Sequence, residues 1–405
     1  MGIADAEDSL RELKELTASA GARVVGTATQ RSPDPDPATL LGRGKVHEVR
    51  TEAHAAGADL VIFDHDLTPT QLRNLEKLLD LKVIDRTQII LDIFAGRARS
   101  REGQLQVELA QLNYLLPRLS GHGTVLSRLG GGIGTRGPGE QQLEYDRRRI
   151  RRRIRILSES IERVRSQRAL HRAHRRDQNL HTVALVGYTN AGKSTLFNSL
   201  TSAQVVTSAR MFATLDPTVR ALPLDAHSTA LLSDTVGFIR KLPPHLVAAF
   251  RATLEELEEA RLLLHVTDAS DPQRAAQDAA VEVLLENLGV ATKPRLHIWN
   301  KVDLLAPAER RKLDAEEASV TVSALTGEGF DILRRRISDV LAPDPVVESD
   351  FELSARDGKC LALLHQSGTV VSERYEADRV LVRARVPESI RKKLKPCSPE
   401  AGEER

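Results

Sequence analysis

Five short segments between residues 187 and 325 constrain this chain more than any other feature. In chain order they read GYTNAGKS, FATLDPT, DTVG, NKVD and SAL. One such segment can arise by chance, but the whole set in this order indicates a single pocket built at the ends of neighbouring strands. The set predicts a site for a guanine nucleotide and Mg²⁺.

The first segment, Gly187 to Ser194, has the spacing of a phosphate-binding loop. It follows an apolar run, residues 183–186, that is typical of a buried strand, and it precedes a helical pattern. Backbone N–H groups in such a loop point toward phosphate oxygens, and the following helix favours an anion at its N-terminus. We expect Lys193 to reach the β- and γ-phosphates and the Ser194 hydroxyl to ligate Mg²⁺. Alone, this segment leaves ATP and GTP equally open.

The fourth and fifth segments are expected to select the base. The Asp303 carboxylate can accept hydrogen bonds from guanine N1–H and from its exocyclic amine. Adenine would leave this carboxylate unpaired, so such a site rejects adenine strongly. The backbone of Ser323 and Ala324, after a short β-rich run, is expected to hold the guanine O6. A surface turn is the alternative for residues 300–303, because Asn and Asp favour turns.

The second and third segments are candidates for loops that respond to the γ-phosphate. We expect Asp234 to hold Mg²⁺ through a water molecule, the Gly237 N–H to meet the γ-phosphate and Thr214 to supply a second hydroxyl to Mg²⁺. A solvated loop threonine is the alternative for Thr214. Ras-like enzymes orient the attacking water with a glutamine directly after this glycine, but here the position holds Phe238. We therefore expect slow intrinsic hydrolysis that an external partner stimulates.

The candidate site has three groups of residues. The candidate catalytic residues are Lys193, Thr214 and Gly237, and the candidate metal ligands are Ser194 and Thr214. The candidate nucleotide-binding residues are Gly187, Tyr188, Thr189, Asn190, Ala191, Gly192, Lys193, Ser194, Thr195, Phe212, Ala213, Thr214, Leu215, Asp216, Asp234, Thr235, Val236, Gly237, Asn300, Lys301, Val302, Asp303, Ser323 and Ala324.

Charge is distributed unevenly along the chain. The 405 residues carry a net charge of only +2, but residues 147–176 contain thirteen arginines, two glutamates and no lysine. Arginine suits bidentate contact with phosphate, and without interleaved aromatic residues the cluster favours the backbone of structured RNA over stacked bases. A solvated helix face is the alternative.

Apolar spacing predicts two long helices on either side of a glycine-rich stretch. Leucines recur at heptad-like spacing from Leu105 to Leu116, and a similar pattern runs from Ile150 to Val164. Residues 120–139 between them contain eight glycines and one proline, which predicts an antiparallel hairpin with a flexible tip. With Arg128 and Arg136, this tip suits a narrow site on a large partner, and a disordered linker is the alternative.

These patterns place the chain in the α/β class and divide it into four parts, one of them a helical hairpin. We expect a small α/β domain over residues 1–100, the hairpin over 101–179, a nucleotide domain with a mainly parallel sheet over 180–343 and a small α/β domain over 344–405. In the first part, strands are predicted at residues 22–25, 60–63 and from Val83. A disordered tail is expected from Pro396.

The chain ends and cysteines indicate a compartment. The N-terminus is acidic without an apolar stretch, and no run approaches 18 apolar residues, so we expect no signal peptide and no membrane span. Cys360 and Cys397 fit no metal or redox spacing and are expected to be incidental thiols. We expect a cytoplasmic monomer.

The motifs resemble those of the HflX family of ribosome-associated GTPases, in the translation-factor-like class of P-loop GTPases. The resemblance rests on GGGIGTRGPGE before the arginine-rich helix, GYTNAGKSTLFN, FATLDPT, DTVGFIRKLP with the later FRATLEE, and NKVD. It implies GTP hydrolysis on the large ribosomal subunit and a role in splitting stalled or idle ribosomes, particularly under stress. It also implies that the hairpin reaches toward the peptidyl-transferase region.

We therefore predict a Mg²⁺-dependent GTPase that acts as a switch on the large ribosomal subunit and its rRNA, in ribosome splitting, rescue or recycling. GTP is expected to favour ribosome binding, and hydrolysis to GDP is expected to release the factor. One alternative is an RNA-maturation or RNA-modification GTPase. Another is a signalling switch that binds only proteins, which predicts no salt-sensitive RNA binding by residues 147–176.

Overall fold

A computed structural model of the chain describes residues 3–32, 34–119, 138–177, 181–201, 211–225, 228–240, 251–316, 318–341, 346–354, 358–376 and 379–394. The hairpin tip at 120–137 and the predicted tail from Pro396 lie outside these residues. The chain divides into two compact units. One comprises Met1–Arg220 with Leu232–Glu328, and the other comprises Ala221–Leu231 with Gly329–Arg405.

The N-terminal part of the first unit is a small α/β domain, as predicted. Its elements are α1 (Ile3–Ser19), α2 (Arg43–Ala55), β1 (Leu60–Phe63), α3 (Pro69–Leu79), β2 (Lys82–Asp85) and α4 (Arg86–Arg97). Strands β1 and β2 pair in parallel, with Leu60 opposite Lys82. Helix α3 begins sharply because Thr68 and Gln71 form a reciprocal capping box and Pro69 fits the first turn.

The predicted strand at residues 22–25 is wrong. These residues have no regular secondary structure, and the side chains of Val24 and Val25 are 41% and 46% exposed. Among the described residues of this domain, the sheet contains only β1 and β2. The apolar pair therefore has no neighbouring strand and no core to cover.

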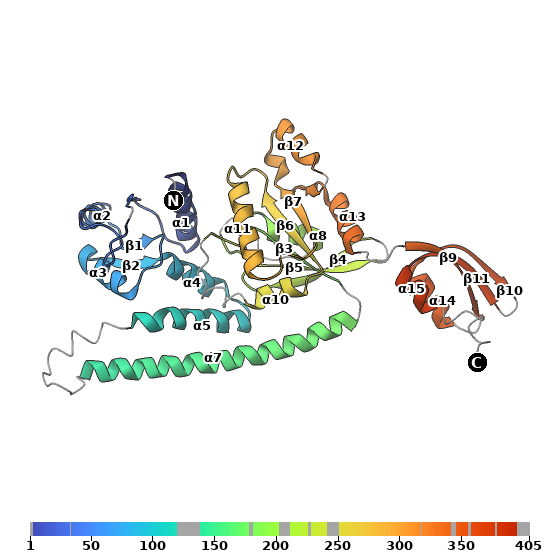
Figure 1. Ribbon diagram of the computed structural model, residues 1–405, viewed down its shortest axis with the longest axis horizontal. Helices are drawn as coiled ribbons and strands as arrows, with labels where there is room; N and C mark the ends of the chain where they lie inside the picture. The colour runs from blue at the N-terminus through green and yellow to red at the C-terminus, as the bar shows by residue number, and fades with distance from the viewer. Residues whose placement is uncertain are drawn as a thin grey trace. The chain divides into compact units, whose positions relative to one another are not determined.

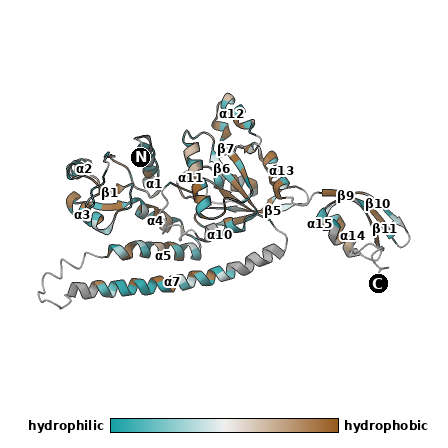
Figure 2. Cartoon of the chain, in the orientation of Figure 1, coloured by the Kyte–Doolittle hydropathy of each residue, from teal (hydrophilic) through white to brown (hydrophobic). Residues whose placement is uncertain are grey.

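Two helices follow the N-terminal domain, α5 (Arg101–Arg118) and α7 (Pro138–Asp177), and they pack side by side (Figure 1). The predicted leucine seam of α5 is only half-buried. A second face, with Val107, Ala110 and Tyr114, is buried in the N-terminal core. Figure 2 shows mainly hydrophilic residues along the described part of α7. None of the described helices combines the length and apolar character that a bilayer span requires.

A six-stranded sheet carries the motif segments, with the strand order β4-β5-β3-β6-β7-β8. Its strands are β3 (Thr182–Val186), β4 (Thr218–Pro223), β5 (Thr229–Asp234), β6 (Leu262–Asp268), β7 (Arg295–Asn300) and β8 (Ser319–Thr321). The pairs β3–β6, β6–β7 and β7–β8 are parallel. The associated helices are α8 (Lys193–Thr201), α10 (Arg251–Glu259), α11 (Arg274–Asn287), the 3-10 helix η1 (Val302–Leu304) and α12 (Pro307–Asp314). Strand β3 is buried on both faces, as expected for a central parallel strand.

The second unit contains α13 (Phe330–Leu341) and a small α/β domain. That domain comprises β9 (Val346–Ser354), α14 (Gly358–Ser367), β10 (Thr369–Glu376), β11 (Arg379–Pro387) and α15 (Glu388–Leu394). Its antiparallel sheet has the order β10-β11-β9, and β11 alternates buried and exposed residues. The expectation of an incidental thiol is wrong for Cys360, which is disulfide-bonded.

Candidate active site

The phosphate-binding loop requires glycine at two positions for distinct steric reasons. Gly187 and Gly192 have φ values of +148° and +92°, which side chains rarely adopt. A Cβ atom on Gly187 would lie 2.2 Å from the Val266 carbonyl oxygen. A Cβ atom on Gly192 would lie 2.2 Å from Nδ2 of Asn300. The loop therefore closes tightly between β3 and α8, as the sequence predicts.

Lys193 lies inside this loop and is almost fully buried. Its Nζ donates hydrogen bonds to the carbonyl oxygens of Gly187 at 3.0 Å and Tyr188 at 2.6 Å. Burial lowers the pKa of the Lys193 ammonium to about 8, although the nearby Asp234 carboxylate acts in the opposite direction. A buried cation that has only carbonyl partners and one carboxylate neighbour is well prepared to bind phosphate.

Three oxygen-bearing side chains converge beside Lys193. The hydroxyls of Ser194 and Thr214 lie 2.7 Å apart, and they donate to Oδ2 of Asp234 at 2.7 and 2.8 Å. Oδ1 of Asp234 is buried without a hydrogen-bond partner, and burial raises the pKa of this carboxyl. Two hydroxyls and a carboxylate with an unused oxygen fit the ligand preference of Mg²⁺.

The base-selecting segments are joined through Asn300. Its side-chain amide donates to the Ala191 carbonyl at 2.8 Å, and its Oδ1 accepts from the Ala324 N–H at 3.0 Å. These bonds make Asn300 a brace between the phosphate loop and the 323–324 segment. Its contact with the nucleotide stays a prediction. Asp303 is exposed, and its Oδ1 accepts a hydrogen bond from the Ser323 hydroxyl at 2.6 Å.

Phe238 follows the DTVG segment and is buried beside the phosphate loop. Its side chain is 6% exposed and packs in a cluster with Tyr188 and Leu257. Its backbone N–H donates to the Gly187 carbonyl at 3.1 Å, and its carbonyl accepts from the Thr189 N–H at 2.8 Å. These contacts fix the residue against the phosphate loop, so this position supplies no polar group that could orient water.

The loops that follow α8 and β5 are embedded in the N-terminal domain. Met211, Phe212 and Leu215 share its buried core, as do Val236 and Ile239. The rings of Phe212 and Phe94 meet edge to face at 4.8 Å. Thr214 lies beside Ser194, and the side chain of Asp216 bonds to the start of α5. The nucleotide contacts predicted for residues 212–216 stay predictions.

Sequence patterns missed a buried ion-pair network between these parts. Arg86 is 2% exposed and lies 2.9 Å from the Glu12 carboxylate and 2.8 Å from the Asp64 carboxylate. Its Nη2 also donates to the Arg240 carbonyl at 3.0 Å. Glu12 in turn accepts a hydrogen bond from the Tyr188 hydroxyl at 2.5 Å. No local spacing marks these residues, because their partners are distant in sequence.

Family models match most of the chain in series. The models are described as GTP-binding GTPase N-terminal over residues 7–95, GTP-binding GTPase Middle Region over 97–175, and 50S ribosome-binding GTPase over 182–301. A solved structure described as the complex of SsGBP with GDP is 25% identical, at a TM-score of 0.44, over 82% of this chain and 94% of that chain.

Together, the phosphate loop, the parallel sheet and these models define a P-loop GTPase. Two curated relatives named GTPase HflX cover nearly the whole chain. The relative from Caldanaerobacter subterraneus is 46% identical over 96% of this chain and 90% of its own length. The relative from Escherichia coli is 45% identical over 95% and 90%. The chain belongs to the HflX family of GTPases and hydrolyses GTP.

Proposed function

We propose that this GTPase is a Mg²⁺-dependent, cytoplasmic, monomeric switch that binds the large ribosomal subunit and its rRNA. It acts in ribosome splitting, rescue or recycling under stress. The family model described as 50S ribosome-binding GTPase supports the choice of partner. The main support for a switch is that Phe212 and Val236 pack in the core of the N-terminal domain. These two residues belong to the two loops that are expected to respond to the γ-phosphate.

This packing joins nucleotide chemistry to the surface that would meet RNA. A change of either loop on GTP binding or hydrolysis has to repack Phe94 and the buried face of α5, because the shared core is close-packed. Helix α5 contacts α7, and Arg153 of α7 forms a two-bond ion pair with Glu108 of α5. A change in the loops between the GTP and GDP states can therefore be transmitted to the arginine-rich helix α7 through continuous contacts.

The first half of α7 offers cationic groups to a polyanion. Four of its arginines are exposed and take part in none of the ion pairs found among the described residues: Arg149, Arg151, Arg152 and Arg155. Exposed guanidinium groups without a carboxylate partner lose little when they bind phosphate. This surface supports contact with the phosphate backbone of rRNA.

The site supports slow hydrolysis in the absence of a partner. Ser194, Thr214 and Asp234 would hold Mg²⁺, which offsets phosphate charge when bound. Lys193 and the loop amides would hold the phosphates, the Gly237 N–H would meet the γ-phosphate, and Asp303 would bind guanine. With Phe238 packed in the core, a group that orients water has to come from outside or from reordered loops.

The test is steady-state GTP turnover of the full chain with large ribosomal subunits, with small subunits as the control. We expect strong stimulation by large subunits alone, followed by subunit separation in a sedimentation assay. No stimulation would reject the proposed partner. Stimulation without separation would favour an RNA-maturation role.

A variant separates RNA contact from catalysis. Replacing Arg149, Arg151, Arg152 and Arg155 with Gln is expected to leave basal turnover unchanged and to reduce the salt dependence of subunit binding. Each lost phosphate contact lowers the slope against log salt by about 1. Arg383→Gln, in the C-terminal domain and paired with Asp350, is the matched control. An unchanged slope in the fourfold variant would indicate a protein-only contact.

A further inference from the structure

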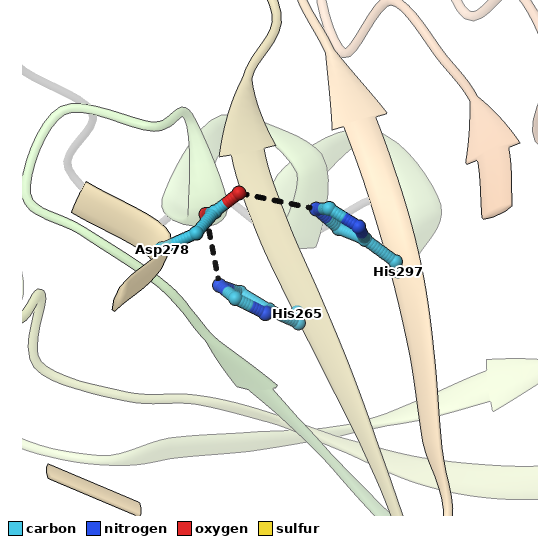
Figure 3. A group of neighbouring side chains, drawn as sticks. All are labelled: His265, Asp278 and His297. Carbon is cyan, nitrogen blue, oxygen red and sulfur yellow. Dashed lines mark ion pairs between the residues drawn. The ribbon is translucent and has the colours of Figure 1, made fainter. Parts of the chain in front are cut away.

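Two histidines and an aspartate meet on one face of the nucleotide-domain sheet (Figure 3). Nε2 of His265 lies 3.2 Å from Oδ1 of Asp278, and Nε2 of His297 lies 3.7 Å from Oδ2. One ligand atom from each residue falls within 4.8 Å of the others. Among the described residues, this is the group of three with the donor types and spacing of a metal site.

The fold fixes this juxtaposition. His265 on β6 and His297 on β7 are direct partners in the parallel register, so their side chains leave the sheet on the same face. Their rings stack with centroids 5.0 Å apart and an interplanar angle of 21°. Helix α11 packs on β6 and brings Asp278 over the pair. Because the three elements are rigid, the donors are held in place without a bound ion.

The third donor, His265, is buried at 3% exposed. Its Nε2 lies 3.2 Å from Oδ1 of Asp278 but does not meet hydrogen-bond geometry with it. A bound cation would give this buried nitrogen a well-directed partner. The Thr267 hydroxyl donates to Oδ1 of Asp278 at 2.6 Å and lies 2.9 Å from Nε2 of His297, so it orients both of the other donors.

We propose that His265, Asp278 and His297 form a binding site for a divalent transition-metal ion of the zinc class. Two imidazoles and one carboxylate are a common zinc donor set, and a water molecule completes the tetrahedron. Ligand atoms in such a site lie about 3.3 Å apart, given metal–ligand bonds of about 2.0 Å. The donors reach this spacing by a small rotation of His297, whose side chain is 29% exposed and open to solvent. The ion ties α11 to β6 and β7.

The experiment uses the full chain, stripped with a chelator and saturated with Mg²⁺ and GDP so that the nucleotide site is filled. Zn²⁺ is titrated against a chromophoric competitor, and Co²⁺ serves as a spectroscopic probe. We expect one equivalent of Zn²⁺ and a Co²⁺ spectrum of low coordination number. In His297→Ala and Asp278→Asn, affinity is expected to fall at least about tenfold.

His181→Ala is the matched control, because His181 lies in the same domain but contacts Arg261 instead of the cluster. GDP affinity of each variant verifies its fold, and His297→Gln replaces His297→Ala if that variant is misfolded. Failure of the wild-type chain to bind stoichiometric Zn²⁺ would overturn the proposal. Retention of wild-type affinity by both cluster variants would also overturn it, since the ion would then bind elsewhere.

Discussion

The Asp216 carboxylate accepts hydrogen bonds from the backbone N–H and the hydroxyl of Ser100, the residue that caps α5. The N–H contact is 2.7 Å long, and the Arg99 N–H adds another at 2.8 Å. A carboxylate at a helix N-terminus is also stabilised by the helix dipole. Thr214, two residues before Asp216, is thereby held beside Ser194 and Asp234.

Breaking this contact should weaken GTP binding selectively. In Ser100→Ala, we expect the affinity for a non-hydrolysable GTP analogue to fall about tenfold, or ~1.4 kcal/mol, while GDP affinity changes little. The reason is that Thr214 is used only with the γ-phosphate. Fluorescent-nucleotide titrations measure both affinities. Equal losses for the two nucleotides would contradict a role through Thr214.

A steric variant tests the same contact without deleting a polar group. In Gly103→Ala, the added Cβ would lie 2.3 Å from Oδ1 of Asp216, so this variant should reproduce the Ser100→Ala phenotype. Gly96→Ala in α4 is the matched control, because its Cβ meets nothing within 4 Å. A wild-type GTP affinity in Gly103→Ala would show that the loop tolerates displacement of Asp216.

Asp303→Asn should change base preference. The amide replaces one acceptor with a donor opposite guanine, so we expect GTP affinity to fall at least about 100-fold, given ~1–3 kcal/mol for each unsatisfied group. Binding of xanthosine triphosphate should appear, since xanthine carries a carbonyl in place of the amine. Competition titrations measure the preference. Ser323→Ala removes the 2.6 Å hydrogen bond to Asp303 and the acceptor of the Thr326 N–H at 3.2 Å, and it should weaken GTP binding without altering selectivity.

We expect the folding stability of the nucleotide-free protein to depend on pH because of Lys193. Burial lowers its pKa from 10.5 to about 8, so between these values the unfolded chain binds more protons than the folded chain. Stability from this group therefore rises with pH from about 8 to 10.5 and is lowest below 8. In Lys193→Met, the nucleotide-free chain should be more stable than wild type at pH 7, with the difference vanishing above pH 10.5. Denaturant titrations across this range check the sign, and a pH-independent difference would contradict it.

Arg86→Met should destabilise the first unit strongly. It leaves the buried carboxylates of Glu12 and Asp64 without their cation, and losses of about 3–5 kcal/mol are typical of a broken buried pair. Urea unfolding measures the effect. Arg383→Met, which breaks an exposed pair with Asp350, should leave the midpoint nearly unchanged. Similar shifts in the two variants would mean that the buried network contributes no more than a surface pair.

The phosphate-loop motif was predictable because its glycines are required by the local backbone conformation. Gly187 and Gly192 are required by positive φ and close neighbours, and both reasons act within one strand–loop–helix segment. The strands that carry these motifs were also predictable, since buried parallel strands are continuously apolar. The same reasoning failed at residues 22–25, because an apolar run becomes a strand only where another strand can pair with it.

The sequence by itself determined the class of protein, because each nucleotide motif keeps a fixed spacing within one short segment and follows a recognisable apolar strand. Only the tertiary structure decided what surrounds that site. The bonds of Asp216 to Ser100 and of Arg86 to Arg240 join residues 116 and 154 positions apart. The meeting of His265, Asp278 and His297 likewise depends on strand register and on how α11 packs. Contacts of this kind depend on close packing between elements, which leaves no periodic signal in the chain.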